Sequence, residues 1–140
     1  MAKPREHTFI ASPDKVYGAI SKMLILNAAA IDEKYSDCTD ISKINYSYGE
    51  KQKVTVKVTE TVPDQMIKYH TAMEKRERYD VTFELVAVEG NTKMLYSIDI
   101  VTDIKKIETN YNFMRYLYTY KQRKAFKKMC VYLQSVIDEM

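Results

Sequence analysis

Tyrosine is the residue type in this chain whose number and spacing could do chemistry. The sequence contains 12 Tyr, 4 Phe and no Trp among its 140 residues. Each tyrosine has a large apolar ring and a hydroxyl group that needs a hydrogen-bond partner when it is buried. Several tyrosines in one interior therefore indicate either a polar network or a pocket that holds water and a ligand. The alternative, which the sequence leaves open, is that the rings fill the interior and close any cavity.

The candidate ligand-binding residues come from five alternating segments and from the last helical segment. They are Tyr46, Val56, Tyr69, Phe83, Tyr96, Ile98, Met114 and Tyr118. We expect these side chains to line one cavity for an apolar or amphipathic small molecule, with tyrosine hydroxyls as its few polar groups.

Acid–base catalysis would need a titratable side chain in that cavity, with a pKa tuned by burial. Asp80, Glu84 and Asp99 fall on the polar side of the alternation, and His70 lies on the side opposite to the neighbouring tyrosine. His7 shares a face with the phenylalanine two residues later and could point inward, as a hydrogen-bonded structural group. The pattern favours binding over catalysis, although tyrosine phenols leave an acid available.

No motif in the sequence indicates a cofactor or a metal. Phosphate-binding glycine loops, HExxH and GxSxG are absent. Cys38 and Cys130 have neither metal-ligand nor redox-pair spacing, so we expect two free thiols in a reducing cytoplasm. The chain starts without a signal-peptide pattern, and the longest apolar stretch, residues 23–31, is far shorter than the roughly 20 residues that span a bilayer.

The positive charge of the chain is concentrated near its end. Residues 105–140 hold eight basic and three acidic residues, whereas the formal net charge of the whole chain is only +3. Lys121, Lys124 and Lys128 share one helical stripe, with Tyr116 and Tyr120 nearby in sequence. A solvated helix face explains this stripe, and the alternatives are contact with an acidic protein, a membrane surface or nucleic acid. The small net charge makes nucleic acid the weakest of these, since such binding needs several phosphate contacts together.

Length, composition and periodicity together predict one α+β domain over residues 1–140. Apolar residues make up 46% and charged residues 29%, with no linker and no repeat. Residues 6–11 form a first strand, after which Ser12, Pro13 and Asp14 provide an N-cap, a proline at the first helical position and an acid in the first turn. The spacing of Val16 and Ile20 predicts a helix from there, and residues 28–31 a second short helix.

From residue 41 the hydrophobic period changes to two, which is typical of half-buried strands. The alternating positions are Ile44, Tyr46 and Tyr48, then Val54, Val56 and Val58, then Ile67, Tyr69 and Met73, then Val81, Phe83 and Leu85, then Met94, Tyr96, Ile98 and Ile100. Short turns between them predict an antiparallel meander. After Asp103 the helical period returns to the end of the chain. We expect a curved antiparallel sheet wrapped around a long C-terminal helix, with two short helices after the first strand.

This order of elements resembles the START-like helix-grip superfamily, also called SRPBCC, over nearly the whole chain. The similar segments are ASPDKVY at residues 11–17, VPDQMIKY at 62–69, and residues 79–85 followed by Gly90-Asn91-Thr92. The chain looks like a small bacterial branch of that superfamily without an assigned activity. The resemblance implies a cavity between sheet and helix for an apolar or amphipathic molecule. The glycine-rich loop of some plant members is missing, so their ligand contacts are not carried over.

Three functions follow in order of preference. The first is a non-enzymatic small-molecule binding domain without metal or cofactor. The second is a protein-interaction module, with a homodimer as one form, that uses the basic helix face or a sheet edge. The third is an enzyme of the polyketide-cyclase type.

Overall fold

The computed structural model describes the backbone of residues 4–73, 78–101 and 107–140, and the side chains of residues 4–73, 78–100 and 122–140. Strand β1 (Arg5–Phe9) is followed by helix α1 (Pro13–Ile31) and two 3-10 turns, η1 (Glu33–Tyr35) and η2 (Ile41–Lys43). Strands β2 (Asn45–Tyr48), β3 (Val54–Val62), β4 (Met66–Met73), β5 (Arg78–Val88) and β6 (Asn91–Val101) follow, and helix α2 (Ile107–Asp138) closes the fold. No helix within the described residues is long and apolar enough to cross a membrane.

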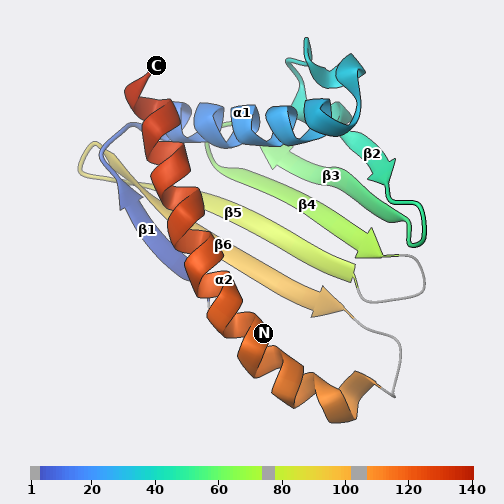
Figure 1. Ribbon diagram of the computed structural model, residues 1–140. Helices are drawn as coiled ribbons and strands as arrows, with labels where there is room; N and C mark the ends of the chain where they lie inside the picture. The colour runs from blue at the N-terminus through green and yellow to red at the C-terminus, as the bar shows by residue number, and fades with distance from the viewer. Residues whose placement is uncertain (1–3, 74–77, 102–106) are drawn as a thin grey trace.

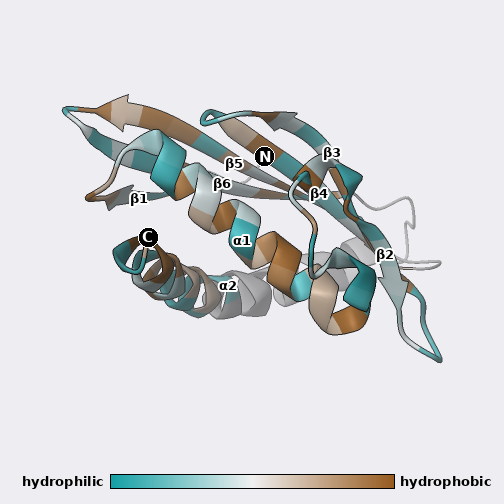
Figure 2. Ribbon diagram, turned by 90° about the horizontal axis from the view of Figure 1, so that it is seen from above, coloured by the Kyte–Doolittle hydropathy of each residue, from teal (hydrophilic) through white to brown (hydrophobic). Residues whose placement is uncertain are grey.

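The six strands form one curved antiparallel sheet in the order β1-β6-β5-β4-β3-β2, and both helices lie on the same side of it (Figure 1). This is the α+β architecture that the sequence predicted. Viewed from above, α2 lies farther from the sheet than α1 does (Figure 2). The turn between β2 and β3 contains Gly49 at φ +103°, where a Cβ atom would lie 2.2 Å from the carbonyl oxygen of Gln52. Only glycine fits this turn.

One expectation about the helices is wrong. Residues 28–31 do not form a separate short helix, because α1 runs without interruption over 19 residues to Ile31. Alanine is the best helix former, and the polar Asn27 lies on the exposed side of α1, so nothing interrupts the helix there. The helix ends where Asp32 adopts an extended backbone conformation, and the Asp32 carboxylate accepts a hydrogen bond from the Lys34 backbone N–H at 3.1 Å.

Tyr35 holds the start of β2 in place. Its side chain is buried, and its hydroxyl donates to the Asn45 carbonyl oxygen at 2.6 Å and accepts from the Asn45 backbone N–H at 3.1 Å. The same segment is tied to β3, because the Val58 backbone N–H donates to the Ile44 carbonyl oxygen at 3.0 Å. These hydrogen bonds fix the course of the irregular connection between α1 and β2.

The period of two correctly predicted the faces of the strands. Residues directly opposite one another across antiparallel strands point to the same side of the sheet. Val81 and Phe83 of β5 are buried on the helix side, which we call the inner face, whereas Glu84 is exposed on the other side, the outer face. The outer face carries ion pairs such as Lys93 with Glu6 at 3.2 Å and Arg78 with Asp80 at 3.1 Å.

The core lies between the inner face and the two helices. Its largest fully buried side chains include Phe9, Ile20, Phe83, Met94 and Leu133. The residue two positions beyond α2 reaches the first half of α1, since a Cβ atom on Gly18 would lie 3.1 Å from the Met140 side chain. Close packing of this kind loses stability when buried methyl groups are removed.

Two neighbouring positions on α2 provide a stability test. Leu133 is 0% exposed and Val131 is 72% exposed. We expect Leu133→Ala to lower the free energy of unfolding by about 2–5 kcal/mol through the cavity that it leaves. Val131→Ala is the matched control, with an expected change within about 0.5 kcal/mol. Urea unfolding curves measure both, and equal effects of the two substitutions would show that this side of α2 does not face the core.

A second test uses the buried thiol of α2. Burial raises the pKa of the Cys130 thiol from 9.0 to about 11. Between these pH values the folded chain keeps a proton that the unfolded chain has lost, so the stability that this group contributes falls as pH rises through the window. We expect the difference in unfolding free energy between the protein and Cys130→Ala to be smaller in that pH window than at neutral pH, and to fall as pH rises. A pH-independent difference would contradict the burial of the thiol.

Candidate functional site

All six candidate residues from the sheet lie on the inner face. Tyr46 of β2 is the register partner of Val56 of β3, and Phe83 of β5 is the partner of Tyr96 of β6. Val81 is paired both with Tyr69 and with Ile98, which places these two residues on the same face. The structure therefore brings the predicted sheet residues onto one surface.

The other two candidates belong to α2, in its first half. The side chains of Met114 and Tyr118 lie outside the described residues. The same holds for Tyr116, Tyr120 and Lys121 of the basic segment. Lys124 and Lys128 are described, and both are exposed.

A chain of aromatic rings crosses the inner face and joins it to α2. The ring centroid of Phe83 lies 6.2 Å from that of Tyr69 and 5.1 Å from that of Tyr96. On the helix side, the Tyr96 ring stacks against Phe126 of α2 with the centroids 5.5 Å apart. Ring pairs at such distances attract one another beyond the effect of burial alone. This chain fixes the distance between α2 and β6.

The inner face is unevenly covered. Near the β5-β6 hairpin the side chains of Leu85 and Met94 are buried. At the other end, one register row crosses β2 to β6, and all of its members are only half-buried. This row, called the inner-face row below, consists of Tyr46, Val56, Thr71, Tyr79 and Ile100. It is the part of the inner face where a ligand could reach the sheet.

Ile100 of this row was expected on the inner face but was not a site candidate, and Thr71 and Tyr79 were not singled out at all. The signal that could have found Thr71 was the continuation of the period from Tyr69 through to Met73. Tyr79 likewise precedes Val81 and Phe83 at the spacing of two. Both residues carry hydroxyl groups, which adds polar atoms to an otherwise apolar row.

Tyr46 keeps its proton in this environment. Burial raises the pKa of its hydroxyl, and the neighbouring hydroxyls of Tyr48 and Tyr35 raise it further. The Tyr46 ring lies 6.1 Å from the Tyr35 ring and 6.3 Å from the Tyr48 ring, measured between centroids. The hydroxyl is therefore neutral near pH 7 and can donate or accept a hydrogen bond, but it is not a base.

The acidic side chains of the strands and His70 do not lie on the inner face, as the alternation predicted. His70 and Asp99 are both register partners of Asp80, on the outer face, and Glu84 is exposed there. His7 lies on the inner face at the edge strand β1, where its ring contacts Phe9 at 4.5 Å between centroids. Among the residues with described side chains, no three of His, Cys, Asp and Glu gather closely enough to hold a metal ion.

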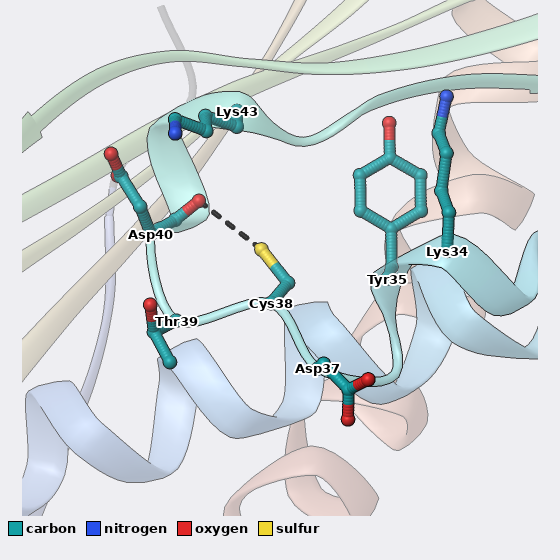
Figure 3. A pocket seen from close by; sticks show the side chains of 7 residues that line it. All are labelled: Lys34, Tyr35, Asp37, Cys38, Thr39, Asp40 and Lys43. Atoms are coloured by element: carbon teal, nitrogen blue, oxygen red, sulfur yellow. Dashed lines mark hydrogen bonds between the residues drawn. The ribbon is translucent and has the colours of Figure 1, made fainter.

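A separate surface pocket of about 430 Å³ lies in the connection between α1 and β2 (Figure 3). It is lined by Lys34, Tyr35, Asp37, Cys38, Thr39, Asp40 and Lys43. The Cys38 thiol donates to the Asp40 carbonyl oxygen at 3.3 Å, and the Asp40 carboxylate accepts from the Ser42 backbone N–H and hydroxyl. These bonds are local, and they shape the loop itself. An irregular segment has no period, so no sequence signal could have located this pocket.

Comparisons with known proteins place the fold. No protein-family model and no curated protein matches the chain. A solved protein from Rhodobacter sphaeroides is 18% identical and has a TM-score of 0.58, with 100% of this chain and 95% of that chain covered. Ara h 8.0201 is 13% identical at a TM-score of 0.58, with 98% and 97% covered. DynU16, from the dynemicin biosynthetic locus, is 8% identical at a TM-score of 0.60, with 97% of this chain but only 46% of DynU16 covered.

At identities this low, the likeness concerns the fold alone and carries no activity or ligand with it. It agrees with the START-like resemblance at the level of architecture. The chain has the α+β helix-grip fold of these solved structures.

Proposed function

We propose that residues 1–140 form a single helix-grip domain that binds an apolar or amphipathic small molecule on the inner face of the sheet. The observation that carries this proposal is the half-buried state of the inner-face row. A sheet packed only for stability would bury Val56 and Ile100 as completely as Val58 and Val81, which are nearly inaccessible. A ligand on this row would remove its apolar side chains from water.

The dimensions and chemistry of the row indicate the ligand class. Five neighbouring strands at a spacing of about 4.8 Å make the row about 19 Å long, enough for an acyl chain or a system of fused rings. The row contains no charged side chain. Its polar atoms are the hydroxyls of Tyr46, Thr71 and Tyr79. An uncharged or weakly polar ligand with one or two hydrogen-bonding groups fits this surface best.

Catalysis of the polyketide-cyclase type has weaker support. The described carboxylates of the sheet lie on its outer face, and the raised pKa of Tyr46 keeps this phenol protonated at neutral pH. A protonated phenol can orient a carbonyl oxygen of the ligand, but it cannot abstract a proton. We therefore place binding before turnover. The free thiols of Cys38 and Cys130 fit the reducing cytoplasm that we also propose as its location.

The second candidate function, a protein-interaction module, is favoured by the edge strand β2. Within the described residues this strand pairs with β3 alone, and Tyr48 on it is 44% exposed. An edge strand of this kind can pair with a strand of a partner or of a second copy. Native mass spectrometry of the purified protein separates the two functions. A monomer that carries a bound small molecule supports ligand binding, whereas a ligand-free dimer supports the interaction module.

Substitution of Val56 tests the proposed binding surface directly. We expect Val56→Gln to weaken the binding of the uncharged apolar probe Nile red about tenfold, because an amide buried against an apolar ligand costs about 1–3 kcal/mol. Thr55→Gln is the matched control, since Thr55 is the adjacent residue of β3 and points to the outer face. Nile red fluorescence titrations give the affinities, and circular dichroism checks the fold.

Two results would count against the proposal. One is a folded protein that does not bind Nile red. The other is an equal loss of affinity in the Val56 and Thr55 variants, which would show that the probe binds outside the inner face.

A further inference from the structure

The second half of α2 presents a charged and apolar stripe to solvent. Lys124, Lys127, Lys128 and Val131 are spaced by three, four and seven residues, so they lie on one face of the helix. All four side chains are exposed, and Val131 is 72% exposed. The opposite face of α2, with Cys130, Leu133 and Ile137, is buried against the fold. We call these four exposed residues the α2 stripe.

Acidic residues are few along the helix that carries the stripe. The sequence has no Asp or Glu between Glu108 and Asp138. Asp138, at the end of the helix, accepts a hydrogen bond from the Gln134 side chain at 2.8 Å. Arg123 adds a further exposed cation beside Lys124 and Lys127. This face of α2 is therefore a local positive surface.

Exposed apolar side chains accompany these cations. On α2, Tyr132 is 39% exposed beside Val131. A lysine-rich face that serves only for solvation does not need exposed apolar side chains at its end. Exposed apolar side chains next to a basic surface mark an interaction surface.

We propose that the α2 stripe docks the protein on an anionic lipid surface. Lysine side chains lay their apolar stems along the helix and extend their ammonium groups to lipid phosphates. Val131, at the C-terminal end of the stripe, enters the boundary between headgroups and acyl chains, and Tyr132 lies at the level of the headgroups. Nucleic acid fits less well, because the exposed valine would face phosphates and few cations are available to neutralise them.

This docking goes beyond the binding of a small molecule and does not rest on it. The inner-face row lies on the sheet, whereas the α2 stripe lies on the side of α2 that faces away from the buried core. Loss of lipid docking would leave the affinity for Nile red unchanged. The two proposals can therefore fail separately.

Vesicle cosedimentation tests the docking. The probes are vesicles of phosphatidylcholine alone and of phosphatidylcholine mixed with phosphatidylglycerol, at low salt and at about 0.15 M salt. We expect binding to the mixed vesicles, weakened by salt. The variant K127Q/K128Q should lower the partition coefficient about tenfold or more, since each cation near such a surface contributes substantially. Val131→Ser should lower the partition coefficient as well, and it should abolish the binding that remains at the higher salt concentration.

The matched control is K57Q/K68Q, which removes the same charge from exposed lysines on the outer face of the sheet. It should bind the mixed vesicles like the unsubstituted protein. Three results would overturn the docking proposal: no binding of the unsubstituted protein to the mixed vesicles, an equal loss in the control variant, or retention of an oligonucleotide at low salt without retention of vesicles.

Discussion

The packing of Phe83 between Tyr69 and Tyr96, continued by Phe126 of α2, is the contact on which the rest of the structure depends. These rings join three neighbouring strands to the last helix. They hold α2 against β6 through the Tyr96–Phe126 pair, and Phe83 itself is inaccessible to water. The rings lie in the middle of the sheet. Beyond them, toward the β5-β6 hairpin, the helices cover the inner-face side chains. The side chains of the inner-face row, at the other end of the sheet, remain partly exposed to solvent.

The curvature of the sheet affects which part of the inner face the helices cover. A flat sheet would meet a straight helix along its whole width. In the curved sheet of this protein, the inner-face side chains near the β5-β6 hairpin are buried, whereas those of the inner-face row are only half-buried. The register pairs then place Tyr46, Val56 and Ile100 together, although they are distant in sequence. Lys68, Arg78 and Lys93 form ion pairs with acidic side chains on the outer face, so these charges lie away from the inner-face row.

The strands and the identity of the inner face could be predicted from sequence because a period of two fixes the side to which each side chain points. Tyr46, Phe83 and Ile98 were placed on the inner face correctly for that reason. The period does not fix the register between strands, so the row that includes Thr71 and Tyr79 could not be recognised. The continuity of α1 was missed because the polar Asn27 was given more weight than the helix-forming alanines after it. The pocket beside Cys38 depends on two 3-10 turns, whose path is set by single hydrogen bonds and not by periodicity.

The most direct test of the central claim is an NMR titration of the labelled protein with a medium-chain fatty alcohol, an uncharged amphipathic ligand. Backbone amide shifts map the contact residue by residue. If the uneven covering of the sheet forms the binding surface, the largest shifts will occur at Val56, Thr71 and Ile100, with little change at Thr55 or His70. Shifts confined to the outer face or to the loop around Cys38, or no saturable shifts at all, would contradict the account.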